Sequence, residues 1–336
     1  MASTTPPTMD HQPTAEAIAQ AHTIITKYLP PTPLRHYPRL DAWVGNDVQV
    51  WVKHEDHQPT GAFKVRNGLV AVSLLPDKLR ERGIIGATRG NHGQGLAFAG
   101  KMLGAPVVIC VPHGNSPSKN QAMIDLGAEL LIEGQDYDES VAVCMDLVNQ
   151  RGLTMVHSTN NDGVLAGAAT ITAEILDQAP TDLSAIFVAV GGGSQASGAI
   201  AAVQARGAAI DIFAVQANGA NAAAVSWHSK KQQSIEHANT FAGGLATRAA
   251  YDYTFPILQS GLRDFITVSD DELATAIRAY VDHTQTIAEG AGAASLAGLK
   301  QVSEQHAGKK VVVVLSGRNL DGDVLRAILN GNTPLS

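Results

Sequence analysis

Residues 185–215 read AIFVAVGGGSQASGAIAAVQARGAAIDIFAV and contain the pattern that decides the fold. Two predominantly apolar runs rich in β-branched residues flank a glycine-rich turn and a stretch with helical spacing. Strands without polar alternation are typically buried on both faces, and two of them joined through a helix lie parallel in one sheet. This stretch therefore predicts a β-α-β unit of an α/β protein.

The same pattern recurs along most of the chain. Short β-branched runs, each followed by an amphipathic stretch, occupy the ranges 48–53, 83–88, 105–111, 128–134 and 311–316. The helical stretches are rich in Ala and Gly, which allows close packing on a sheet. We expect two domains, each with a parallel-rich sheet flanked by helices. The large domain is predicted to comprise residues 1–54 and 153–336, and the small domain residues 55–152.

The composition favours a small-molecule function. The 336 residues carry a formal charge of −7, 45% are hydrophobic and 16% are charged. No Lys/Arg run offers a surface for nucleic acid or an anionic membrane, and no apolar run reaches the ~18 residues of a membrane span. The two cysteines lie in apolar surroundings, which suits reduced thiols in the cytoplasm. Residues 1–14 lack signal-peptide features and are predicted to form a disordered leader.

The loop VGGGSQASG, residues 190–198, is the first candidate binding site. Consecutive glycines let backbone N–H groups turn toward a phosphate, and the N-terminus of the following helix adds a favourable dipole. A nicotinamide dinucleotide also suits such a loop, but its ribose needs an acidic residue at the end of the next strand, where this chain has Gln216. On glycine spacing alone, a phosphate ligand and a simple tight turn both stay open.

A second loop, KHEDHQPTGAFKVRNGL at residues 53–69, carries a candidate catalytic lysine. Lys64 opens a helical stretch directly after apolar Phe63. The positive helix end and the apolar neighbour are expected to lower the pKa of this lysine, and a lysine of lowered pKa can form a Schiff base. A plain surface lysine is the alternative interpretation.

Two further loops follow predicted strands. In ATRGNHGQGLAFAG, residues 87–100, backbone N–H groups over 88–92 can hold a carboxylate, and the Asn91 side chain can donate to a phenolic oxygen. The hydroxyl of Ser316 emerges at the end of the last predicted strand. Ligands of open parallel sheets bind at the carboxyl ends of the strands, so we expect all four loops to meet at one site.

Taken in order, these motifs resemble the fold type II pyridoxal-phosphate (PLP) enzymes of the serine/threonine dehydratase and serine racemase family. The resemblance runs from about Ile18 to the end of the chain. The family pattern is TPL, K-x-E-x-x-Q-x-T-G-S-F-K, S/A-G-N-H-x-Q, a tetraglycine loop, E-x-A-G-A and S-G-G-N-x-D. The corresponding stretches here are Thr32–Leu34, Lys53–Lys64, Gly90–Gln94, Gly191–Ser194, Glu289–Ala293 and Ser316–Asp321.

The resemblance implies PLP as the cofactor and Lys64 as the catalytic residue that forms a Schiff base with it. The implied cofactor contacts are Phe63, Lys64, Asn91, Gly191, Gly192, Gly193, Ser194, Glu289 and Ser316. The implied substrate contacts are Thr88, Arg89, Gly90, Asn91, His92 and Gly244. The large domain then binds the cofactor, and the small domain contacts the substrate. A serine cannot hold a proton on the pyridine nitrogen as an aspartate does, so the ring is a mild electron sink that favours elimination.

The implied reaction is dehydration and deamination of a β-hydroxy amino acid, by default threonine or serine, to a 2-oxo acid and ammonia. A cytoplasmic homodimer is implied as well. Two functions of other classes stay open on the residues: a nicotinamide-dependent oxidoreductase and a non-catalytic amino-acid sensor. The chain ends about 15 residues after Asp321, so we expect no C-terminal regulatory domain and no feedback inhibition.

Two arginines depart from the family pattern. Arg89 stands where racemases of the group have serine, and a guanidinium cannot serve as a second base, which disfavours racemisation. Arg318 replaces a glycine beside Ser316. Both could hold a second substrate carboxylate, so a lyase for an acidic or bulky hydroxy amino acid, such as hydroxyaspartate, is the alternative function. Exposure to solvent, or pairing with Asp321 or Asp323, is the other interpretation of these arginines.

Three further departures from the family pattern concern the substrate pocket and the cation site of relatives. Ala62 replaces a family serine, and Ser-Thr-Asn at 158–160 replaces a family segment that begins with proline, so the substrate pocket is expected to differ. Relatives hold a cation with one carboxylate at the position of Gln216 and another near Ala222, and this chain has neither. No metal is therefore expected.

Overall fold

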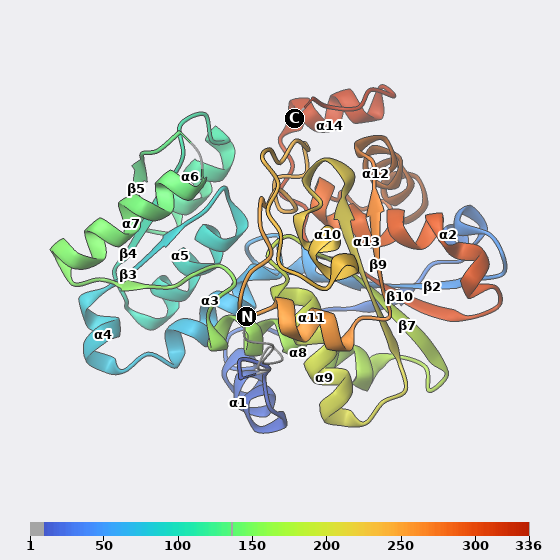
Figure 1. The fold of residues 1–336 in the computed structure, drawn as a ribbon, viewed down its shortest axis with the longest axis horizontal. Helices are drawn as coiled ribbons and strands as arrows, with labels where there is room; N and C mark the ends of the chain where they lie inside the picture. Colours follow the sequence, from blue (N-terminus) through green and yellow to red (C-terminus); the bar gives the residue numbers. More distant parts are fainter. Residues whose placement is uncertain (1–9, 136, 336) are drawn as a thin grey trace, which may run out of the picture.

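Two sheets organise the chain in the computed structural model (Figure 1). The structure describes residues 10–335 except residue 136, so residues 1–9 of the predicted leader lie outside it. Within that part, the larger sheet has the strand order β1 (Leu34–His36), β2 (Gln49–His54), β10 (Lys310–Leu315), β7 (Leu183–Ala189), β8 (Asp211–Ala217) and β9 (Asp264–Val268). The smaller sheet has the order β5 (Glu129–Ile132), β4 (Val107–Val111), β3 (Ile84–Ala87) and β6 (Thr154–Met155).

The sheets are parallel apart from one pair. Only β1 runs antiparallel to its neighbour β2 among the strands of the described residues. Strand β10 shows why its sequence is continuously apolar: Val311 and Val313 belong to the core on one face, and Val312 and Val314 to the core on the other. Burial on both faces removes the polar alternation of a half-exposed strand. The predicted α/β class, with two parallel-rich sheets flanked by helices, is confirmed.

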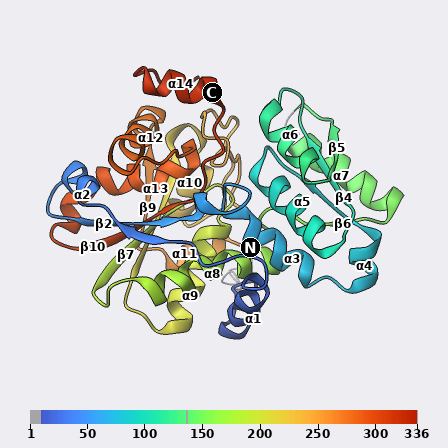
Figure 2. The same ribbon diagram turned by 180° about the vertical axis from the view of Figure 1, so that it is seen from behind.

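Helices cover both sheets, as the two opposite views show (Figures 1 and 2). Those with the smaller sheet are α4 (Asp77–Arg82), α5 (Asn91–Leu103), α6 (Pro117–Asp125) and α7 (Tyr137–Arg151). Those with the larger sheet are α2 (Pro38–Val44), α8 (Asp162–Gln178), α9 (Ser194–Arg206), α10 (Ala222–Ser229), α11 (Phe255–Gly261), α12 (Asp270–Thr284), α13 (Gly290–Gln301) and α14 (Gly322–Leu329). Across residues 10–335 without residue 136, no helix combines the length and apolarity needed to cross a bilayer.

Two helices lie where the halves meet: α1 (Ala15–Ile25) and α3 (Lys64–Ser73). Val65 and Leu69 of α3 share one apolar core with Leu96 of α5 and Val164 of α8, so α3 packs against both halves. Strand β6 pairs with β3, so the smaller sheet continues past the boundary expected at residue 152. That boundary is too early by at least this strand, and we keep the division into a large and a small domain as a proposal.

A buried network of charges ties α3 to the larger half. The Arg66 Nε and Nη2 atoms each donate to Glu55 over 2.8 Å, and Nη1 and Nη2 donate to Glu174 of α8 over 2.6 and 2.9 Å. Lys53 Nζ, from β2, donates to Glu174 over 2.6 Å, and the Thr32 hydroxyl donates to Glu55 over 2.6 Å. All five side chains are buried, and two cations balance two carboxylates. The network holds the first turn of α3 against β2 and α8.

Replacement of Arg66 by Met is expected to lower the free energy of unfolding by about 3–5 kcal/mol, because two buried carboxylates lose their shared cation. Urea denaturation followed by circular dichroism measures the change. The matched control is Arg206→Met, which removes an exposed ion pair with Asp177 of 2.6 Å and should cost less than about 1 kcal/mol. Equal losses in the two variants would contradict the structural role of the buried network.

Candidate active site

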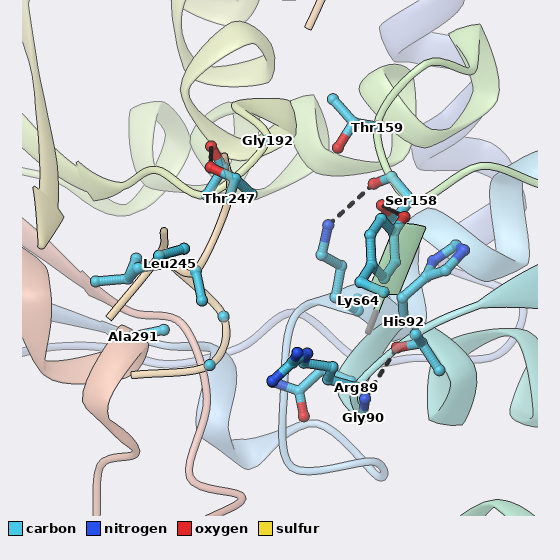
Figure 3. Close-up of a pocket in the computed structure, with 18 of the residues that line it drawn as sticks. Lys64, Arg89, Gly90, His92, Ser158, Thr159, Gly192, Leu245, Thr247 and Ala291 are labelled. Atoms are coloured by element: carbon cyan, nitrogen blue, oxygen red, sulfur yellow. Dashed lines mark hydrogen bonds between the residues drawn. The ribbon is translucent and has the colours of Figure 1, made fainter. Parts of the chain in front are cut away.

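A cavity of about 530 Å³ lies at the carboxyl ends of β3, β4, β7 and β10 (Figure 3). All four sequence motifs that follow predicted strands open into it, as the sheet topology requires. Every residue expected to contact cofactor or substrate lines this cavity: Phe63, Lys64, Thr88, Arg89, Gly90, Asn91, His92, Gly191, Gly192, Gly193, Ser194, Gly244, Glu289 and Ser316. The structure thus brings them together, and the role of each stays a prediction.

Lys64 is the first residue of α3 and points into the cavity (Figure 3). Its Nζ donates to the Ser194 hydroxyl and to the Ser158 carbonyl, each over 3.1 Å. The loop before it is fixed to the end of β10, because the Phe63 N–H donates to the Ser316 carbonyl over 3.0 Å. Burial lowers the pKa of Lys64 to about 8. The predicted lowering is confirmed, with burial as its cause, and the surface-lysine alternative is wrong.

The glycine loop makes a close-fitting cradle in front of α9. A Cβ on Gly191 would lie 2.3 Å from the Gly244 carbonyl oxygen, and one on Gly192 would lie 2.2 Å from the Thr159 hydroxyl oxygen. Gly193 has a φ of +97°, a conformation that favours glycine. Helix α9 begins at the next residue, and the N–H groups of its first turn have no partners within the helix. Loop and helix end together form an anion site of the kind that binds phosphate.

Amide and carboxylate groups at one side of the cavity are joined by hydrogen bonds. The Asn91 Nδ2 atom donates to Glu289 Oε1 over 2.6 Å, and Asn91 Oδ1 accepts from Asn319 Nδ2 over 2.8 Å. Burial raises the pKa of Glu289, against the opposing effects of Lys119 and of the hydrogen bond from Asn91. A primary amide has two N–H donors, so one Asn91 donor is left for a ligand oxygen.

The loop after β3 leads into α5. The Thr88 N–H donates to the Cys110 carbonyl over 3.0 Å, and the Gly90 N–H donates to the Thr88 hydroxyl over 2.9 Å. The N–H groups of Thr88 and Gly90 were expected to help hold a carboxylate, but both already have hydrogen-bond partners. Fewer N–H groups of residues 88–92 are therefore available for a substrate carboxylate. The N–H groups at 91–93, in the first turn of α5, are those that a helix leaves without internal partners.

Two histidines near the cavity are neutral at physiological pH. The His92 Nε2 atom lies 2.9 Å from the Val156 carbonyl oxygen, which only accepts, so Nε2 carries the proton. Burial, together with the nearby Lys64 ammonium, lowers the pKa of His92 to about 3 and that of His157 to about 4. The His157 Nδ1 atom accepts two backbone N–H groups of the following turn, over 3.0 and 2.9 Å. Neither ring competes with Lys64 for a proton.

Apart from Gly244, which the family resemblance implied, one wall of the cavity was not predicted. Residues 236–239, 241 and 243–248 line it without belonging to any helix or strand, and Figure 3 shows Leu245 and Thr247 across the cavity from Lys64. Tyr137 also lines it, with its hydroxyl 3.3 Å from the Ser158 hydroxyl. The adjacent glycines at 243 and 244 are the one local signal that could have indicated the long segment.

The two unusual arginines lie in different places. Arg89 lines the cavity and has no ion-pair partner among the described residues. Arg318 is exposed and is not among the residues that line the cavity, so a carboxylate clamp formed by both arginines is wrong. Arg318 forms no ion pair with Asp321 or Asp323 among the described residues, and the Asp321 Oδ1 atom accepts a hydrogen bond from the Ser116 hydroxyl over 2.9 Å.

The residues present fit PLP better than a nicotinamide dinucleotide. A lysine of lowered pKa, an anion cradle and a spare amide donor surround one cavity, and each matches one functional group of PLP. Gln216, at the position where a dinucleotide site needs an acid, is buried, and its Oε1 accepts the Ala224 N–H over 3.1 Å. A nicotinamide dinucleotide would therefore find no acidic side chain at this position to bind its ribose.

The chain is similar to known proteins over nearly its whole length. A family model described as pyridoxal-phosphate dependent enzyme matches residues 25–317. An L-threonine ammonia-lyase from Thermotoga maritima is 30% identical over 317 residues, which cover 94% of this chain and 78% of that protein. A biosynthetic L-threonine dehydratase, IlvA, from Haemophilus influenzae is 32% identical over 88% of this chain, which spans only 58% of that relative.

Solved structures agree. The structure of maize serine racemase superposes with a TM-score of 0.88 at 27% identity, covering 95% of this chain and 98% of that one. The family match and the Thermotoga match both extend over most of the chain, and the family match contains Lys64, the glycine loop and Ser316. This protein belongs to the pyridoxal-phosphate dependent enzyme family.

Proposed function

We propose that this enzyme is a PLP-dependent ammonia-lyase that dehydrates and deaminates a β-hydroxy amino acid, by default threonine or serine, to a 2-oxo acid and ammonia. One observation carries the proposal. Lys64 Nζ lies in the cavity, 3.1 Å from the hydroxyl of Ser194, the first residue of α9, which directly follows the glycine cradle. The pKa of this lysine is lowered to about 8. The threonine ammonia-lyase and dehydratase among its relatives support the reaction class.

The residues that would hold PLP are those of the cradle and its surroundings. Residues 191–194 would bind the phosphate, the spare N–H of Asn91 the ring hydroxyl, and the Ser316 hydroxyl the pyridine nitrogen. When bound, PLP supplies an electron sink for the negative charge that develops on the substrate Cα. A neutral serine beside the ring nitrogen keeps that sink mild, which favours loss of the β-hydroxyl.

Lys64 performs the proton transfer from Cα in this proposal. A base is most effective when its pKa lies near the working pH, and burial places the pKa of Lys64 at about 8. The Ser194 hydroxyl and the Ser158 carbonyl accept from Nζ and orient it. The free N–H groups at the start of α5 would hold the substrate carboxylate, so that the Cα–H bond faces the lysine.

Arg89 supports a second candidate function, elimination from an acidic hydroxy amino acid such as hydroxyaspartate. Its guanidinium lines the cavity without an ion-pair partner in the described part of the chain, and Lys119 lines the cavity as well. A guanidinium binds a carboxylate through two parallel hydrogen bonds. It stays protonated at pH 7 and offers no second base, which argues for elimination rather than racemisation.

We propose in addition that the enzyme acts in the cytoplasm as a homodimer. Cys110 and Cys144 are both free and buried, which suits a reducing compartment. Two-fold assemblies are the commonest among soluble oligomers. A solution mass of about twice 35.1 kDa by light scattering would support the dimer, and a monomer mass would exclude it.

The rate at which the cofactor-free enzyme combines with PLP is expected to rise with pH and to level off above about 8, because only the neutral amine of Lys64 attacks the aldehyde. Stopped-flow absorbance between pH 6.5 and 10 measures this rate. Lys64→Arg is the control and should show no such phase. A rate that rises without a plateau up to pH 10 would indicate an ordinary lysine and contradict the buried state of Lys64.

The role of Arg89 is tested by substrate preference. If it binds a second carboxylate, Arg89→Ala should lower kcat/KM for hydroxyaspartate at least about tenfold, since a hydrogen bond to a charged group contributes about 1.5–3 kcal/mol. The value for threonine should change by less than about threefold. Arg318→Ala, an exposed arginine outside the cavity, is the matched control. An unchanged order of preference among hydroxyaspartate, threonine, serine and phenylserine would exclude the carboxylate role.

A further inference from the structure

A second group of chemically reactive side chains lies at the end of β2, where the turn η1 (Glu55–His57) leads toward Lys64. His54 Nδ1 is 3.0 Å from Asp56 Oδ1, and His57 Nε2 is 3.7 Å from Asp56 Oδ2. One ligand atom from each of the three side chains lies within 4.8 Å of the others. None of the three lines the cavity, and the proposed reaction uses none of them.

We propose that His54, Asp56 and His57 bind a divalent transition-metal ion of the zinc type. Two imidazoles and one carboxylate form a donor set that suits zinc, and three protein ligands leave a fourth position for water. Donor atoms around a tetrahedral zinc lie about 3.3 Å apart at its usual bond lengths. The separations of 3.0 and 3.7 Å are close to this value, and they run to the two different oxygens of Asp56, Oδ1 for His54 and Oδ2 for His57. A shared ion therefore needs a turn of the His57 ring or of the Asp56 carboxylate. The His57 side chain is 38% exposed, which gives an ion a way in.

Tyr37 supplies the outer contact that a metal-binding histidine needs. Its hydroxyl lies 2.9 Å from His54 Nε2, on the side of the ring opposite to Asp56. Asp56 accepts hydrogen bonds, so Nδ1 of a neutral His54 carries the proton and Nε2 accepts from Tyr37. When Nδ1 binds a metal, that proton moves to Nε2 and the Tyr37 oxygen accepts it. Such a partner fixes the ring and its tautomer for the metal.

An independent observation comes from Tyr280 on α12. Its side chain is fully buried, and its hydroxyl has no hydrogen-bond partner within the described residues. Tyr37 packs against the apolar core that contains Tyr280. Burial raises the pKa of Tyr280, and Asp56 and Tyr37 contribute in the same direction. A buried hydroxyl without a partner is unfavourable, and an ion with its bound water at this cluster would provide one.

The surroundings set the expected strength and effect of binding. Burial lowers the pKa of His57, the Asp56 carboxylate opposes this, and His54, Arg35 and Arg318 lower it further. The same two guanidinium charges repel a cation held by His57, so we expect them to weaken binding. Glu55, between His54 and Asp56 in sequence, belongs to the buried network with Arg66. A bound ion would thus reinforce the segment that ends at Lys64 and raise the melting temperature.

Zinc titration of the tag-free holoenzyme, after dialysis against a chelator, tests the site by isothermal calorimetry. One ion per chain should bind. His57→Ala should weaken binding at least about tenfold, and Tyr37→Phe about 10–100-fold, as loss of an outer partner does. Arg318→Gln should tighten binding, because it removes an opposing charge. His22→Ala, a histidine of α1 outside the cluster, is the matched control and should leave binding unchanged.

Melting temperatures measured in the presence of chelator show whether each variant is folded. Added zinc should raise the melting temperature of the wild-type protein but not that of His57→Ala. Zinc binding by His57→Ala and Tyr37→Phe with wild-type affinity would overturn the proposal, as would a wild-type protein that binds no zinc. Binding is measured without turnover, so the result is separate from the fate of the proposed reaction.

Discussion

The buried guanidinium of Arg66, held between Glu55 and Glu174, is the interaction on which the arrangement of the site depends. It lies two residues after Lys64 and fixes the first turn of α3 to the end of β2 and to α8. The hydrogen bond from Phe63 to the end of β10 fixes the same turn from the other side. A lysine side chain is long and flexible, so Nζ keeps its desolvated position in the cavity only if the backbone at Lys64 is held rigidly. The charge network holds this backbone in place and takes no part in the chemistry.

Much of the architecture follows from local sequence pattern. Apolar β-branched runs predicted seven strands, because strands buried on both faces cannot be polar. Strands β1, β6 and β9 were not predicted. The first two have only three and two residues, too few for a pattern. Strand β9 contains Asp264 and Thr267, which hide its apolar run, although the capping box of Ser269 and Glu272 directly after it marks where it ends.

The site was predicted in part for a similar reason. Loops that follow buried strands converge by topology alone, so the glycine loop, the Asn91 loop and Ser316 could be placed together. The direction of a side chain cannot be obtained this way. Arg89 and Arg318 are equally unusual in sequence and both are exposed, yet only Arg89 lines the cavity. The pKa of Lys64 also depends on burial by segments far away in sequence, among them the turn at Ser158.

We propose that Lys64 is the residue that holds the cofactor. Reduction of the PLP-loaded enzyme with borohydride makes the link between lysine and cofactor permanent, and peptide mass spectrometry then locates it. We expect one phosphopyridoxyl group per chain, on Lys64. A label on another lysine, or an enzyme that takes up no label, would contradict it.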